Sequence, residues 1–259
     1  MPQLPNDTRW NSQVDCLKTY IKNYNHYLDI IEKHEGDIKH NIKKIIDNAG
    51  IFREVKNLLI QLEKCEIALD KLQSDSTSLS DACEVWLSLL KDEDLKPYYM
   101  EIKLKFDEAM EPFHFLANLT DIKYQGKSLS IEQEAAAEAW LSDRHNEYVA
   151  GYYDFRLKVT TTFPPHMFND NFISTISSER WWGTIDLKQR LHQKSLPLPE
   201  GFAKFFQSLH SCPACTGSIE RVFSTFGIVW SKLRNRLGSD RAEKLVQIYR
   251  HLRGEEFDW

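Results

Sequence analysis

Residues 14–31, VDCLKTYIKNYNHYLDII, decide the fold class of this chain. Apolar side chains recur there at spacings of three and four, with Lys, Asn and Asp between them. A period of about 3.6 residues is that of one face of an α-helix that packs on a core. The apolar positions are Val14, Leu17, Ile21, Tyr24, Leu28 and Ile31. We therefore expect a long amphipathic helix near this end of the chain.

Similar spacings predict helices along most of the remaining sequence. Gly and Pro are scarce, at 10 and 9 of 259 residues, which disfavours a β architecture with many turns. Each apolar seam lasts only about three turns, so the prediction is an all-α multi-helix bundle and not one long coiled coil. The further helices are expected over residues 38–46, 51–72, 79–90, 99–113, 130–157 and 202–209, and from Ser239 onward.

Three local patterns predict where these helices start and stop. The run Asn48-Ala49-Gly50 is expected to end the second helix. Pro112 is expected to bend or end the fifth. Ser130 and Gln133 have the spacing of a capping box, in which each residue satisfies a backbone N–H of the other.

Residues 159–176 are expected to form a loop. Residues 159–163, VTTTF, are strand-like in composition but run into Pro164-Pro165, so we expect an extended loop there. Residues 163–176 are expected to be irregular. The paired aromatics Trp181 and Trp182 that follow are interpreted as packing elements, as is the stretch from Phe113 to Leu119.

Positive charge is concentrated near the C-terminal end. The whole chain has a formal net charge of −5, with 42% hydrophobic and 27% charged residues. Between Ser218 and Arg253 there are eight Lys or Arg and three Asp or Glu, a net charge of about +5. Such a segment can contact phosphate groups. A solvated helix face with the same residues is an equally good interpretation.

The cysteines do not predict a metal or redox site. There are five, scattered along the chain, which fits a reducing compartment better than a disulfide framework. Cys212 and Cys215 have only His210 as a close further ligand, and a zinc site needs about four. The sequence has no bilayer-length apolar run, P-loop or dinucleotide fingerprint, so we expect no membrane, no cofactor and no small-molecule substrate.

The most distinctive stretches are residues 216–224, TGSIERVFS, and 230–237, WSKLRNRL. They resemble the C-terminal dimerisation region of hAT-family DNA transposases. The family pattern Ser-x-Glu-Arg-x-Phe-Ser is matched by Ser218, Glu220, Arg221, Phe223 and Ser224. The resemblance implies that residues 1–195 are the helical insertion-like domain. Residues 196–259 would then be the dimerisation region, beginning at the break LPLP, 196–199.

In that family the matching glutamate completes an Asp-Asp-Glu metal site on an RNase H-like core, so the resemblance makes Glu220 the catalytic position. The BED zinc finger and the two aspartates would lie upstream of Arg9-Trp10, where this sequence has only eight residues. We therefore expect helices without their sheet, Mg²⁺ only in a restored core, and no DNA cleavage by the chain alone. From residue chemistry alone, Glu220 is a first-turn glutamate in a helix that Ser218 caps.

The resemblance also implies partners and a nuclear location. We expect a homodimer, or a complex with a related hAT protein, formed through apolar side chains of the C-terminal region. These are Phe223, Phe226, Trp230, Leu245, Ile248, Tyr249 and Leu252. A second hypothesis is DNA binding through Arg9, Trp10, Arg234 and Arg236, in which Trp10 stacks on a base. A third is a transposase that needs the missing aspartates from another polypeptide.

Overall fold

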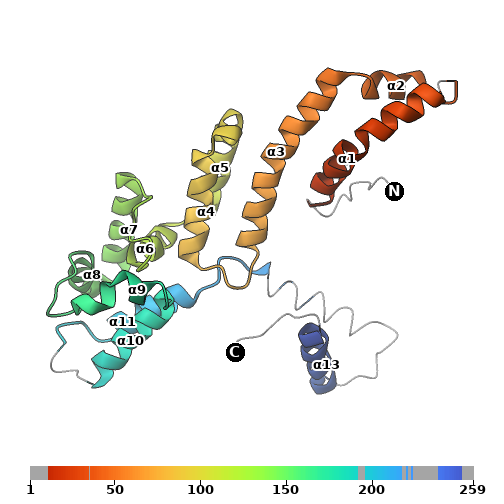
Figure 1. Ribbon diagram of the computed structural model, residues 1–259. Helices are drawn as coiled ribbons and strands as arrows, with labels where there is room; N and C mark the ends of the chain where they lie inside the picture. The colour runs from red at the N-terminus through yellow and green to blue at the C-terminus, as the bar shows by residue number, and fades with distance from the viewer. Residues whose placement is uncertain are drawn as a thin grey trace.

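The computed structural model is mainly helical in the part of the chain that it describes, which is residues 11–34, 36–191, 196–217, 220, 223 and 239–252. It contains no strand in these residues, only an isolated antiparallel bridge between Ser78 and Pro213. The all-α prediction is confirmed. Figure 1 shows the arrangement: three N-terminal helices extend away from a packed body formed by the helices from α4 to α11.

The helices α1 (Asn11–Lys33), α2 (His40–Ile46) and α3 (Ala49–Leu72) form a projecting arm. The predicted seam places Val14 and Ile31 in its interior, at 0% and 5% exposure. Tyr24 stacks on Phe52 of α3 with ring centroids 3.7 Å apart. Few other arm residues are buried, because a layer only two helices thick leaves one side of each helix in solvent.

The body holds the core of the molecule. Its elements are α4 (Leu79–Lys91), η1 (Glu93–Tyr98), α5 (Tyr99–Ala109), α6 (Pro112–Thr120), α7 (Ile131–Arg144), η2 (Asn146–Tyr148), α8 (Val149–Arg156), η3 (Pro165–Phe168), α9 (Asp170–Ile173), α10 (Ser178–Leu191) and α11 (Phe202–Ser211). The last described helix is α13 (Ser239–Leu252), which Figure 1 shows apart from the body.

The paired tryptophans, which the sequence analysis interpreted as packing elements, lie at the centre of this core. Trp181 and Trp182 are both 0% exposed. Trp182 stacks on Phe206 of α11 at 4.8 Å and contacts Phe155 of α8 at 4.9 Å. Each indole N–H has a buried partner, since Trp181 Nε1 donates to a carbonyl of η3 at 2.9 Å and Trp182 Nε1 to one of α6 at 3.0 Å. The core therefore joins α6, α8, α10 and α11 into one unit.

Two predicted boundaries are wrong for a local reason. Asn48 does not end the second helix but caps the N-terminus of α3, where its Oδ1 accepts from Gly50 N at 2.8 Å. The short amide side chain is a good acceptor for the free N–H groups of a first turn. The fifth helix is interrupted near Pro112, as expected, but it already ends at Ala109 instead of residue 113. Pro112 begins α6, at a position where a missing N–H costs nothing.

The predicted helix over 130–157 is also two helices. The Ser130–Gln133 capping box is present as expected and opens α7. At His145, however, the backbone leaves the helical region, with φ −146° and ψ 55°. The His145 ring stacks on Tyr148 at 5.4 Å and contacts Phe205 at 4.6 Å. Packing on α11 thus overrides the local helix propensity.

The segment 159–176 has no strand, as predicted, but is less irregular than expected. Residues 165–168 and 170–173 form the short helices η3 and α9. Asn169 begins α9 by accepting from Asn171 N at 2.9 Å. Phe163 is fully buried against Phe155 and Trp181, so aromatic packing holds the preceding loop on the body.

Candidate functional site

The chain leaves the body after α11, at a point that hydrogen bonds hold in place. Ala214 N donates to Thr77 O at 2.9 Å, beside the bridge between Ser78 and Pro213. These contacts tie the segment that follows α11 to the loop before α4. The first turn of α4 is itself fixed by a capping box between Ser78 and Asp81. The segment that follows α11 therefore has a defined place on the body.

A buried histidine completes this anchor. His210 is on α11, and its ring faces α6 and α4, with Nε2 3.2 Å from Thr120 Oγ1 and Nδ1 3.5 Å from Ser80 Oγ. Asp121 Oδ2 lies 3.9 Å from Nδ1. Burial lowers the pKa of His210 to about 4, although the nearby Asp121 carboxylate opposes this shift. The imidazole is therefore neutral at pH 7.

The two cysteines that follow are directed at the backbone. Cys212 is exposed, and its thiol donates to Ser208 O at 3.3 Å. Cys215 is half-buried, and its Sγ accepts from Gly217 N at 3.4 Å. The third ligand that the sequence offered, His210, is engaged with Thr120 and Ser80 in the body. Within the described ranges, no group of three His, Cys, Asp or Glu side chains has metal-binding geometry.

Glu220 is exposed and lies in a helical turn, as predicted. Its backbone N–H donates to Thr216 O at 3.0 Å, so the turn begins at Thr216. The Thr216 hydroxyl also donates to Glu220 Oε1 at 3.4 Å. The expected cap, Ser218, lies outside the described residues. The carboxylate is thus held near a helix start by the Thr216 hydroxyl, and its catalytic role stays a prediction.

Three of the predicted dimerisation side chains are open to solvent. Phe223 is 70% exposed, and in α13 Ile248 is 55% and Leu245 37% exposed. Their neighbour Val246, which was not among the predicted positions, is 5% exposed. Apolar side chains of this size usually have a partner surface when they gather on one face.

The remaining predicted site residues lie outside what the structure describes. This holds for the backbone of Arg9, Trp10, Phe226, Trp230, Arg234 and Arg236, and for the side chains of Tyr249 and Leu252. The hypothesis that the first two act with the two later arginines on DNA stays a prediction.

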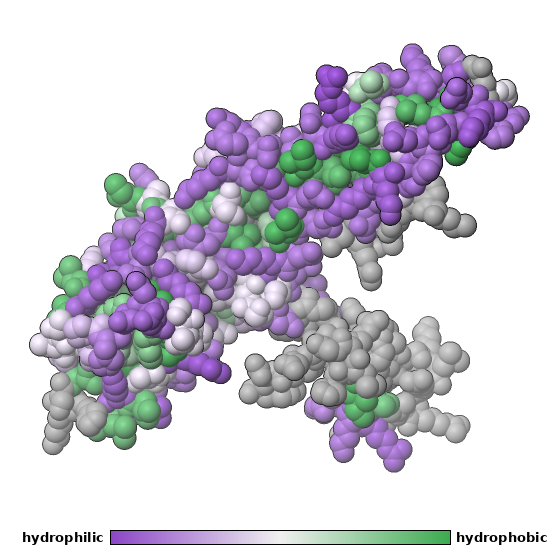
Figure 2. Space-filling model, viewed as in Figure 1, coloured by the Kyte–Doolittle hydropathy of each residue, from purple (hydrophilic) through white to green (hydrophobic). Residues whose placement is uncertain are grey.

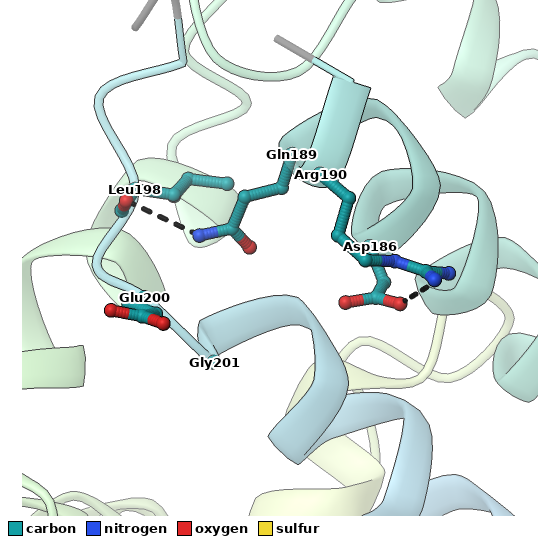
Figure 3. Close-up of a pocket in the computed structure, with 6 residues that line it drawn as sticks. All are labelled: Asp186, Gln189, Arg190, Leu198, Glu200 and Gly201. Carbon is teal, nitrogen blue, oxygen red and sulfur yellow. Dashed lines mark hydrogen bonds and ion pairs between the residues drawn. The ribbon is translucent and has the colours of Figure 1, made fainter. Parts of the chain in front are cut away.

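An open hollow of about 590 Å³ lies where the chain passes from α10 to α11 (Figure 3). Gln189 forms one side, and its Nε2 donates to Leu198 O at 3.3 Å. Asp186 is paired with Arg190 at 3.0 Å across the end of α10. Glu200 lies across the opening. With two carboxylates and one guanidinium, the hollow is net negative, which disfavours phosphate groups. The polar contacts of this hollow stabilise the fold, because the hydrogen bond from Gln189 to the Leu198 carbonyl holds the loop of residues 198–201 on α10.

The comparisons with known proteins support the resemblance in the sequence. Residues 192–252 match the family model described as the hAT family C-terminal dimerisation region. This span runs from the segment after α10 to the last residue of α13. It supports a protein derived from an hAT-family transposase. No curated protein matches the chain.

The matched region is not structurally separate from the rest. Its first helix, α11, packs on α10 through Phe202 and Phe206, which contact Trp182. The domain boundary between residues 195 and 196 stays a prediction, and the aromatic core spans it.

None of the described helices has the length and apolar character needed to cross a bilayer. The sequence did not indicate His210 as an anchor, because one histidine in an apolar helix has no distinctive spacing.

Proposed function

We propose that the chain is a transposase-derived association module, in which residues 192–252 pair with a second copy or with a related hAT protein. The match of this span to a dimerisation region carries the proposal. The exposure of Phe223, Leu245 and Ile248 supports it, since a dimer interface would remove these side chains from water.

The free energy available from these three residues is limited. Covering a large apolar side chain contributes about 1.5–3 kcal/mol. A stable interface buries about 1,600 Å² in total, which is more than three side chains provide. The proposal therefore requires the further apolar positions of the same region, among them Phe226, Trp230, Tyr249 and Leu252.

Light scattering after size-exclusion chromatography tests the proposal on the full chain. We expect a dimer at micromolar concentration and a shift toward monomer in the double variant Leu245→Glu/Ile248→Glu. The matched control is Ile131→Glu, because Ile131 is 83% exposed at the start of α7 in the body. A monomeric parent protein, or a dimer that the double variant leaves intact, would contradict a homodimer formed by α13.

A second function, DNA binding, is favoured by the excess of positive charge between Ser218 and Arg253. Phosphate contacts by Lys and Arg make such binding strongly salt-dependent. Anisotropy titrations at two salt concentrations, on the parent and on Arg234→Gln/Arg236→Gln, test it. No binding at low salt, or binding that the substitutions leave unchanged, would remove this function.

The catalytic hypothesis has a separate test. We propose that the chain alone does not cleave DNA, and that Glu220 contributes to Mg²⁺-dependent cleavage only when other carboxylates complete the site. A two-metal site needs several converging acids. Cleavage by the purified chain that is lost in Glu220→Gln would refute this. Family resemblance also supports a nuclear location, which a fluorescent fusion would test.

A further inference from the structure

A second pocket, on the body and outside the matched C-terminal region, has the composition of an anion site. It has a volume of about 330 Å³, at the lower end of the range of about 300–1,000 Å³ that small-molecule sites occupy. It lies between the turn that follows α6 and the end of α8. The lining residues are Gln125, Lys127, Phe155, Arg156, Lys158 and Phe168.

The lining carries three positive charges and no carboxylate. Arg156 is anchored, since its Nη1 donates to Gln125 O at 2.7 Å and its Nη2 pairs with Glu134 at 3.5 Å. Lys127 and Lys158 differ from it. Neither has a carboxylate partner in the described residues, and both are exposed. Two ammonium groups without a carboxylate partner, beside a guanidinium whose charge Glu134 partly offsets, leave the pocket with a net positive charge that attracts an anion.

The backbone around the pocket is held in an uncommon conformation. Gln125 and Lys158 have φ of 51° and 52°, and in the described part of the chain they are the non-glycine residues with positive φ. Both line the pocket. Strained residues of this kind cluster at ligand sites, because the surrounding structure must hold them in place. Arg156 supplies part of that restraint through its bond to the Gln125 carbonyl.

Gly126 lies in the turn next to Gln125, and its lack of a side chain allows the turn to lie close to Arg156. Its φ is 74°, and a Cβ atom there would lie 2.5 Å from Leu119 Cδ2 and 3.2 Å from Arg156 Nη1. A larger residue would be strained at this φ, and the ends of the Leu119 and Arg156 side chains would have to shift to make room for it. The lack of a side chain at Gly126 therefore leaves room for the Arg156 guanidinium beside the turn.

An aromatic wall completes the pocket. Phe168 is half-buried, and Lys158 Nζ lies 5.2 Å from the centroid of its ring. Phe155, which is 2% exposed, lies behind it at 5.9 Å. Cations beside a partly open aromatic ring are the combination that binds a phosphate and the base attached to it.

We propose that this pocket binds a nucleotide phosphate, with Lys127 and Lys158 as the main cationic contacts and Phe168 as the wall for the base. A free mononucleotide and a nucleotide within a single strand share this chemistry. The proposal is independent of the association function above, because none of its residues lies in residues 192–252.

The test uses the full chain, adenosine monophosphate and a fluorescently labelled single-stranded oligonucleotide as probes. The variant is Lys127→Gln/Lys158→Asn, in which asparagine is chosen because it tolerates positive φ. The control is Lys96→Gln/Lys105→Gln, which removes two other lysines whose side chains are 74% and 66% exposed. Thermal melting of both variants shows that the fold is retained.

We expect the pocket variant to weaken binding about tenfold, equivalent to about 1.4 kcal/mol, and the control to leave it unchanged. For the oligonucleotide, the slope of log K against log salt should fall by about 0.7 for each lysine removed. Weakened binding of the mononucleotide identifies a free nucleotide as ligand. Weakened binding of the oligonucleotide alone identifies a strand. Failure to bind either probe, or equal binding by pocket and control variants, overturns the proposal.

A second measurement needs no substitution. Acetylation of lysines in the parent protein, followed by mass spectrometry, reports the access to each ammonium group. Either probe should slow the modification of Lys127 and Lys158 relative to Lys96. Equal rates with and without both probes would overturn the proposal even if the variants were unstable.

Discussion

Protonation of His210 should destabilise the molecule as the pH falls below about 6.5, and the substitution His210→Gln should remove that contribution. The ring is almost fully buried, with Thr120 and Ser80 as polar neighbours and the Asp121 and Asp81 carboxylates as the nearby negative charges. Burial lowers its pKa from the ordinary value of 6.5 to about 4. The unfolded chain therefore binds a proton at a pH where the folded chain does not.

The sign and size of the effect follow from linkage. A folded-state pKa below the unfolded value gives stability that is fully present above about pH 6.5 and is lost as pH falls toward about 4. At pH 5 these two values give a loss of about 2 kcal/mol relative to pH 7. In a protein of this size, each kcal/mol lowers the melting temperature by about 2–4 °C. We expect a fall of about 4–8 °C from this group.

The assay is thermal melting at pH 7 and pH 5 of the parent, His210→Gln and His114→Gln. Glutamine keeps hydrogen-bonding groups near Thr120 but does not titrate. His114→Gln serves for comparison, because burial also lowers the pKa of His114, and this group therefore contributes to the loss of stability over the same pH range. The Asp81 carboxylate acts at lower pH. Burial alone would raise its pKa, but hydrogen bonds from Tyr124 and Ser78 lower it below its usual 3.8. If His210→Gln loses as much stability as the parent between pH 7 and 5, the reasoning is refuted.

Three further substitutions test the packing, each by chemical denaturation of variant and parent. Trp182→Ala should cost about 3–5 kcal/mol, because the side chain is fully buried at the centre of the core; a cost below about 1 kcal/mol would contradict that placement. Gly151→Ala should cost about 1–3 kcal/mol, since the new Cβ would lie 2.7 Å from Phe202 Cε2, and a neutral result would show that the ring can move. Ser130→Ala should cost about 1 kcal/mol through loss of the α7 cap, whereas Ser174→Ala, outside that cap, serves as its control and should cost less.

The sequence predicted elements well where one helix face carries the signal. The seam from Val14 to Ile31 and the Ser130 capping box depend only on residues a few positions apart, and both are confirmed. The break at His145 could not be found this way. It depends on contacts with Phe205, which lies 60 residues further along the chain, and local patterns carry no information on such contacts.

The candidate sites divide along the same line. The stretch around Glu220 was recognisable because several residues match a pattern at fixed spacing, and the family model agrees with it. The cationic pocket could not be recognised from the sequence. Lys127 and Lys158 are 31 positions apart in unremarkable surroundings, and only the turn after α6 and the end of α8 bring them together. Positive φ values, which help to mark the pocket, are not visible in a sequence when the residues are Gln and Lys.

The thin construction of the arm has a consequence for how the molecule responds to proteases and to sequence change. Its exposed apolar residues include Ile30, Ile42, Ile45, Leu58, Ile60 and Ile67, and Figure 2 shows apolar patches among its hydrophilic residues. With so little buried area, the arm should open locally at a smaller energetic cost than the tryptophan-centred body. Brief digestion should therefore clip the arm first and leave a resistant fragment. Over generations, insertions and deletions should accumulate in the arm while the aromatic body stays constant in length.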